Sequence, residues 1–119
     1  MLKIPALIGS LLLLSGAALA ATPAQEADIR AGQNIAVTSC VACHVVSANQ
    51  AVKPVLGAGI PSFQDIANRP GATAETLQAA MKNARWHEPA MAATLLPMSR
   101  LSDKERGQVA AYILSIRKP

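Results

Sequence analysis

Residues 40–44 read Cys-Val-Ala-Cys-His and contain both cysteines of the 119-residue chain and one of its two histidines. A disulfide between Cys40 and Cys43 would close a loop too short to constrain much of the chain. A thioredoxin-like redox pair needs a preceding strand in a βαβ unit, and the sequence has no such strand pattern. A zinc site lacks ligands, because the only other histidine is His87 and there is no second cysteine pair.

A fourth chemistry uses all three reactive side chains of this stretch. Two thiols separated by two residues can add to the two vinyl groups on one edge of a haem, and the next histidine is then carried beneath the iron. The pattern C-x-x-C-H is the attachment signature of c-type haem. The sequence therefore predicts one covalently bound haem c, held by Cys40 and Cys43, with His44 as an iron ligand.

The start of the chain is typical of a secretory signal peptide. Lys3 precedes a short apolar run, and a small-x-small cleavage site, Ala-Leu-Ala, ends at Ala20. The run is short for a bilayer-spanning helix, which disfavours the alternative of a retained membrane anchor. We expect residues 1–20 to be cleaved and residues 21–119 to form one domain, exported to the periplasm with no further membrane segment.

The composition leaves room for a cofactor in the core. Hydrophobic residues make up 51% of the chain, but there is only one phenylalanine, one tryptophan and one tyrosine. A domain of about 100 residues buries too little surface to be robust without an addition to its core. A haem would supply the missing apolar centre.

Over nearly the whole region after the leader, the chain resembles the small single-haem cytochromes c of bacteria. The resemblance rests on Gly32, eight residues before Cys40, on residues 101–105 (Leu-Ser-Asp-Lys-Glu), and on Tyr112 in an Ala-Tyr-Ile sequence. In that family the first and last helices cross, the glycine permits their close approach, and the tyrosine packs at the crossing. One position departs from the family: Ala36 stands where an aromatic residue is usual.

Local patterns agree with this outline and predict an all-α protein. Helices are expected to begin near Thr22, which precedes a proline, at Thr73, and at Ser102, where Ser-x-x-Glu forms a capping box. Residues 47–61, rich in proline and glycine, are expected to be a loop. The resemblance implies a cytochrome c-like fold of three to four helices with long loops around one haem. The expected inward-facing positions are Ile29, Gly32, Ile35, Ala36, Leu77, Ala80, Met81, Ala84, Val109, Tyr112, Ile113 and Ile116.

Pro61-Ser-Phe is similar to the family's Pro-x-Leu/Phe segment on the histidine side of the haem. The resemblance implies that the carbonyl of Pro61 accepts a hydrogen bond from the ring N–H of His44, which would fix the orientation of the ligand. Pro54 competes for this role, and Pro61 would otherwise be an ordinary turn residue. The loop side chains expected to pack on the haem are Val55, Leu56, Ile60 and Phe63.

We expect a methionine to be the second axial ligand of the iron. Met98, followed by Ser99-Arg-Leu-Ser-Asp, resembles the family's ligand in Met-Pro-x-Leu-Ser-Asp, although Ser99 replaces the proline. Met91 lies in a sequence similar to the family's His-Pro-x-Met pattern and is the second candidate. His87 or an open position remains a further alternative, and Met81 is expected in the core of a helix. A thioether ligand would raise the reduction potential relative to a second histidine.

These features indicate a periplasmic one-electron carrier that works with donor and acceptor proteins. The net charge of +4 is scattered, with no basic run or interleaved aromatics, which argues against nucleic-acid binding. No acid–base or nucleophilic constellation indicates an enzyme. Two alternatives are an electron-accepting subunit of a periplasmic dehydrogenase and a haem-based sensor or ligand-binding protein. The basic residues expected around the haem, either to steer an acidic partner or as ordinary surface charges, are Lys53, Arg69, Lys82, Arg85 and Arg100.

Overall fold

The described part of the chain is helical. The computed structural model describes residues 19–55, 59–83 and 101–119, and within them there are helices and no strand. The elements are α1 (Pro23–Ser39), α2 (Phe63–Ala67), α3 (Ala74–Lys82) and α5 (Asp103–Ser115). The predicted all-α class is therefore confirmed. The expected leader lies almost entirely outside the described residues.

Every described helix begins at a capping box, in which the side chains of the N-cap and of the third helical residue each bond the other's backbone N–H. The N-caps are Thr22, Ser62, Thr73 and Ser102. The predicted starts at Thr22, Thr73 and Ser102 are confirmed. Helix α2 was not predicted, and Phe63, expected in a loop, is its first residue. Its signal in the sequence is Ser62-x-x-Asp65, which is easily overlooked because the helix is too short to show a periodic apolar face.

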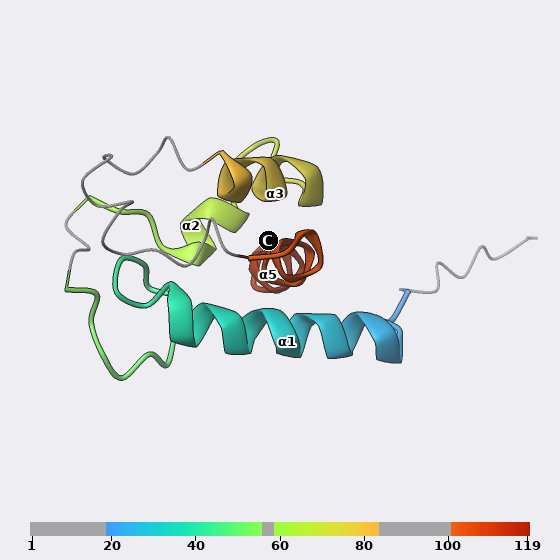
Figure 1. Ribbon diagram of the computed structural model, residues 1–119, viewed down its shortest axis with the longest axis horizontal. Coiled ribbons are helices and arrows are strands. Elements are labelled where there is room, and N and C mark those ends of the chain that lie inside the picture. Colours follow the sequence, from blue (N-terminus) through green and yellow to red (C-terminus); the bar gives the residue numbers. More distant parts are fainter. Residues whose placement is uncertain (1–18, 56–58, 84–100) are drawn as a thin grey trace, which may run out of the picture.

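The two longest helices cross at a glycine. Figure 1 shows α5 passing over α1 at a steep angle. A Cβ atom built on Gly32 would lie 1.9 Å from the carbonyl oxygen of Gln108 and 3.0 Å from the Cβ of Tyr112, so only glycine fits. Ala36, at the position where the family usually has an aromatic residue, is completely buried in the same core cluster as Tyr112. The predicted close crossing of the first and last helices is confirmed.

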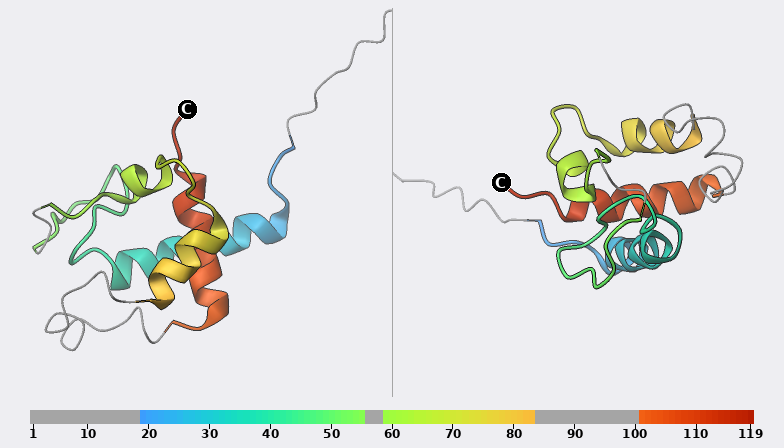
Figure 2. Two further views of the ribbon diagram at one scale, coloured as in Figure 1. Left: turned by 90° about the horizontal axis from the view of Figure 1, so that it is seen from above. Right: turned by 90° about the vertical axis from the view of Figure 1, so that its left-hand side faces the viewer.

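Helix α5 is the centre of the fold. It lies between α1 on one side and α2 and α3 on the other (Figure 1), and seen from above α3 lies across α5 on the side away from α1 (Figure 2). Val109, Tyr112 and Ile113 of α5 are buried as predicted. Leu77, Ala80 and Met81 of α3 lie on one side as predicted, facing the same cavity, although Ala80 is largely exposed. Ala84 lies outside the described residues.

The core is small and has few bulky members. Its buried residues in the described ranges are Ala36, Cys40, Val46, Phe63, Ala67, Leu77, Val109, Ala110, Tyr112 and Ile113. The largest of them that are fully buried are valines, Val46 and Val109. Since buried apolar area is the main source of stability, the polypeptide gains little from this core alone.

We predict that Gly32→Ala destabilises the protein by about 3 kcal/mol, because the added methyl group meets backbone atoms that cannot rotate away. Gly107→Ala is the matched control, since a Cβ there has its nearest neighbour, the Oε1 of Gln78, at an ordinary 3.7 Å. Alanine is favoured over glycine inside a helix by about 1 kcal/mol, so this variant should be more stable than the wild type. Denaturant unfolding measures both, and equal losses in the two variants would contradict the close crossing.

The cap of α5 predicts a pH dependence. The N–H and hydroxyl of Ser102 each bond Oε2 of Glu105 at 2.8 Å, and these hydrogen bonds hold the pKa of Glu105 below its usual value. A carboxyl with a lowered folded-state pKa stabilises the protein above its unfolded-state pKa of about 4.3, and this stabilisation is lost as the pH falls. Glu105→Gln should therefore reduce the acid-induced fall in the free energy of unfolding. An unchanged slope between about pH 5 and 3 would contradict this assignment.

Candidate functional site

The turn that follows α1 places Cys40 and His44 on the same side of the chain. The N–H of Cys40 donates to the carbonyl of Ala36, and the N–H of His44 donates to the carbonyl of Cys40, both at 2.9 Å. This i to i+4 bonding continues the helical path for one more turn. Residues four apart on such a path lie one above the other. Cys40 and His44 therefore face the same space.

That space is a cavity of about 590 Å³, within the range of sites that hold organic cofactors. The turn after α1, residues 59–61, helix α2, residues 69–72, helix α3 and helix α5 all contribute to its wall. The lining is mostly apolar. Among the described residues of the lining, the polar side chains besides Cys40 and His44 are Arg69 and Thr76. A flat apolar macrocycle with a polar edge fits such a lining.

The ring of His44 is held by a backbone carbonyl. Its Nδ1 lies 2.7 Å from the carbonyl oxygen of Pro61. A carbonyl oxygen only accepts, so Nδ1 carries the hydrogen, and in the neutral ring Nε2 is then the nitrogen with the lone pair. The ring of Phe63 lies beside it, with 5.3 Å between the ring centroids. The hydrogen bond that the resemblance implied for Pro61 is present.

The backbone that follows His44 is fixed by two side chains. The Oε1 of Gln50 accepts from the N–H of Val46 at 2.7 Å, and its Nε2 donates to the carbonyls of Val52 at 2.6 Å and His44 at 3.4 Å. The hydroxyl of Tyr112 donates to the carbonyl of Val46 at 2.7 Å. Gln50 was missed from the sequence, because a glutamine in a loop has no spacing that distinguishes it.

The two cysteines are free thiols in this structure. Cys40 is buried and lines the cavity, whereas Cys43 is half-buried and is not among the described lining residues. Burial, and to a lesser extent the nearby Cys43, raises the pKa of Cys40 to about 11, so it is a neutral thiol at physiological pH. Two thiols fit a cofactor that carries two vinyl groups. Among the described residues no three His, Cys, Asp or Glu side chains gather as a zinc site would require.

Several other candidates can be located. Ile60 and Phe63 line the cavity as expected, and Met81, expected in the helix core, is a half-buried part of the same wall. The expectation for Val55 is wrong: it lies in a surface turn after Pro54 and is 80% exposed. Of the basic residues, Arg69 lines the cavity, while Lys53 and Lys82 are exposed and do not. The candidates outside the described residues are Leu56, Arg85, His87, Met91, Met98 and Arg100.

Comparison with known proteins identifies the family to which this chain belongs. The family model of cytochrome c matches residues 29–117. The chain belongs to the cytochrome c family. It is 34% identical over 105 residues to the cytochrome c-552 of Bradyrhizobium diazoefficiens, an alignment that covers 88% of this chain and 90% of the relative. No solved structure was found to match the chain.

Membership of the cytochrome c family establishes the cofactor and the general activity. The protein is an electron carrier that uses covalently bound haem c and exchanges electrons with redox partner proteins. The apolar cavity, the pair of free thiols and the oriented imidazole all suit this group. None of the helices in the described ranges combines the length and apolar character needed to cross a membrane.

Proposed function

We propose that this cytochrome c is a periplasmic one-electron carrier, with its single haem attached through Cys40 and Cys43 and its iron held by His44 and Met98. The observation that carries the proposal is the placement of Cys40 and His44 on one wall of an apolar cavity, with His44 oriented by the carbonyl of Pro61. Family membership supports the electron-carrier role. The chain transforms no substrate by itself.

The thiols carry out the attachment. Each cysteine would add across one vinyl group: its sulfur would bond to one carbon and its hydrogen would go to the other, so the attachment needs no oxidant or reductant. Cys40 and Cys43 are three residues apart in a single turn, where the N–H of Cys43 donates to the carbonyl of Cys40 at 3.2 Å. Such a turn would let both thiols reach the same edge of the cofactor. When bound, the haem iron supplies the change between ferrous and ferric states.

The axial ligands set the affinity of the iron for electrons. His44 would bind through Nε2, while its Nδ1–H bond to Pro61 fixes the ring plane and makes the nitrogen a stronger donor. Met98 is the proposed second ligand, and Met91 is the second candidate. A thioether in this position closes the site to small molecules and raises the reduction potential relative to a second histidine.

Export fits the way in which α1 begins. We propose that residues 1–20 are a signal peptide and that residues 21–119 form the mature domain. Leu19 and Ala20 are exposed and precede the helix, and the N-cap of α1 is Thr22. Cleavage after Ala20 therefore leaves the capping box of Thr22 and Gln25 complete.

The attachment predicts the behaviour of cysteine variants. Cys40→Ala or Cys43→Ala should leave a haem held by one thioether bond or no holoprotein, and the double variant should carry no covalent haem. Mass spectrometry and the reduced absorption spectrum of the denatured protein measure this, because a vinyl group that stays unreacted remains conjugated with the ring. Ser39→Ala, next to Cys40 but without a thiol, is the control. Normal covalent holoprotein from Cys40→Ala would refute the attachment.

The ligand assignment predicts that Met98→Ala loses the weak charge-transfer absorption of a sulfur–ferric-iron bond and lowers the reduction potential. Met91→Ala and Met81→Ala should keep both properties. If only Met91→Ala loses the absorption, Met91 is the ligand and the electron-carrier proposal stands. Rapid binding of carbon monoxide by the wild-type ferrous protein would instead favour an open site and a ligand-binding role.

A further inference from the structure

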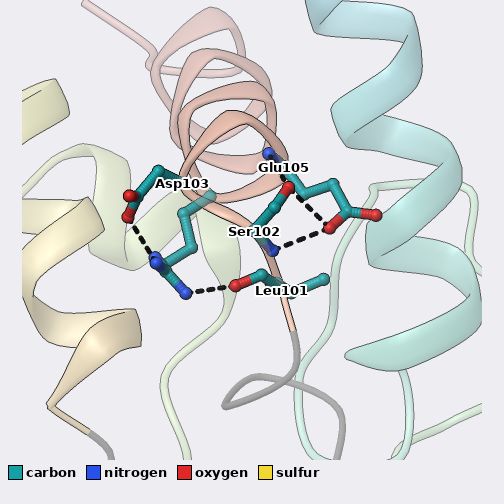
Figure 3. A network of polar contacts seen from close by, with 5 residues as sticks. Leu101, Ser102, Asp103 and Glu105 are labelled. Carbon is teal, nitrogen blue, oxygen red and sulfur yellow. Dashed lines mark hydrogen bonds and ion pairs between the residues drawn. The ribbon is translucent and has the colours of Figure 1, made fainter.

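Two arginines near the C-terminus donate hydrogen bonds to backbone carbonyls, and they differ in where those carbonyls lie. Arg106 bonds the carbonyl of Leu101 and the carboxylate of Asp103, so its partners lie at the start of its own helix (Figure 3). Arg117, just beyond the end of α5, donates from Nε to the carbonyl of Ala67 at 2.7 Å and from Nη2 to that of Ala72 at 2.6 Å. These acceptors lie 50 and 45 residues earlier in the chain.

The two carbonyls that Arg117 bonds bracket a tight turn. The first belongs to the last residue of α2, where helical carbonyls lack a partner within the helix. The N–H of Ala72 donates to the carbonyl of Arg69 at 3.1 Å, and Gly71 has a φ of +80°. With Pro70 before that glycine, this is the pattern of a type II turn. A guanidinium is planar and has fixed donor directions, so one side chain can hold both ends of the turn in one geometry.

Two further hydrogen bonds connect the same segments. The backbone N–H of Lys118 donates to Oδ1 of Asn68 at 3.0 Å, and Nε2 of Gln64 donates to the carbonyl of Ile116 at 3.5 Å. We call residues 116–118 the C-terminal strap. The strap leaves α5 beside α2 (Figure 2), and α2 itself packs on α5. It therefore fastens α2 and the turn that follows it to the central helix.

The turn that Arg117 brackets forms part of the cavity wall. Residues 69–72 all line the cavity that Cys40 and His44 face. The parts of the wall given by α3 and α5 are regular helices that pack against each other, whereas this turn belongs to no helix. Its position at the cavity therefore depends on bonds from other segments.

Among the described residues, two side chains supply such bonds to the backbone of the turn and its flanks. The hydroxyl of Thr76 lies 3.1 Å from the carbonyl of Gly71 and 3.1 Å from that of Thr73, and it has one hydrogen to share between them. Arg117 donates two separate hydrogens to two carbonyls. Arg117 is therefore the firmer of the two attachments, and a single substitution removes it.

We propose that Arg117 is a positioning residue that keeps residues 69–72 in place as a wall of the haem cavity and so limits the access of water to the haem. The inference rests on the proposed attachment at Cys40 and Cys43, which places the cofactor in this cavity. Arg117 is not among the described lining residues, so it acts through the backbone of the turn rather than by contact with the haem.

A loosened wall has a consequence for the affinity of the iron for electrons. Ferric haem carries one more positive charge than ferrous haem, and a charge is more stable in water than in an apolar cavity. Burial is accordingly one of the means by which a protein sets the potential of its haem. Releasing the turn should therefore favour the ferric state and lower the reduction potential.

The test compares three variants of the holoprotein. Arg117→Gln removes the two hydrogen bonds from the guanidinium together with a charge. Lys118→Gln is the matched control, because it removes the same charge one residue further on, and the bond from Lys118 to Asn68 uses the backbone N–H and survives the substitution. Arg117→Lys keeps the charge of the wild type but not the planar fork. A fall in its potential is therefore free of any change in charge, and it preserves the test if Arg117→Gln does not fold.

Two readouts are combined. Hydrogen exchange of the Ala72 N–H, followed by NMR of the ferrous protein, reports opening of the turn. It should be about tenfold faster or more in Arg117→Gln, as expected for the loss of hydrogen bonds from a charged group. Exchange of the Cys40 N–H, which bonds the carbonyl of Ala36, should not change. The reduction potential of Arg117→Gln should be lower than that of Lys118→Gln, with a smaller fall below the wild type in Arg117→Lys.

The outcomes separate this proposal from that of the attachment. Faster exchange at Ala72 but not at Cys40, together with the lower potentials, supports the role of Arg117. Unchanged exchange at Ala72, an equal acceleration at Cys40, or potentials in the two Arg117 variants that match those of their charge-matched proteins overturns it. These results leave the attachment intact if the wild-type protein holds its haem covalently through both cysteines. A wild-type protein without covalent haem overturns both proposals.

Discussion

The contact between α1 and α5 at Gly32 sets how these two helices pack and, through Tyr112, where the loop after His44 lies. Because no side chain separates the helices there, the backbone of Gln108 meets that of α1, and Tyr112 on the next turn packs beside Gly32. From that position its hydroxyl reaches the carbonyl of Val46, two residues beyond His44. A helix crossing far from the reactive residues thus fixes the backbone that carries the imidazole. A wider crossing would move Tyr112 away from this loop.

The same crossing defines the cavity. Cys40 and His44 continue the path of α1, while Val109 and Ile113 of α5 and Leu77 and Met81 of α3 form opposing parts of the apolar wall. The cavity-facing side chains of α2 and α3 are therefore placed by packing on α5, while residues 59–61 and 69–72 add loop segments to the wall. The ring of Phe63 lies 5.3 Å from that of His44 and 6.4 Å from that of Tyr112, which links the imidazole to the core by packing as well as by hydrogen bonds.

The features predicted successfully from the sequence were those with local or strongly restricted chemistry. A capping box pairs residues three apart, so the starts of α1 and α5 followed from Thr22 and Ser102 with their partners Gln25 and Glu105. The start of α3 followed from Thr73 and from Glu75 in the first turn. Helix α2 was not predicted because its five residues are too few to show the helical spacing of apolar side chains. The role of Gln50 was not predicted because hydrogen bonds to backbone groups impose no residue type on the positions that they join. Val55 was misplaced since an apolar side chain in a loop has no periodicity to indicate which way it faces.

The scarcity of bulky buried side chains explains why a permanent bond to the cofactor is useful here. A group held only by contacts stabilises a fold by an amount that depends on its free concentration, and that contribution disappears on dilution. A tethered group has no such dependence, because it cannot diffuse away. Within the described part of the chain the largest completely buried residues are Val46 and Val109, so the haem supplies apolar bulk that these helices lack. Thioether bonds keep the haem in the core for as long as the chain itself remains intact.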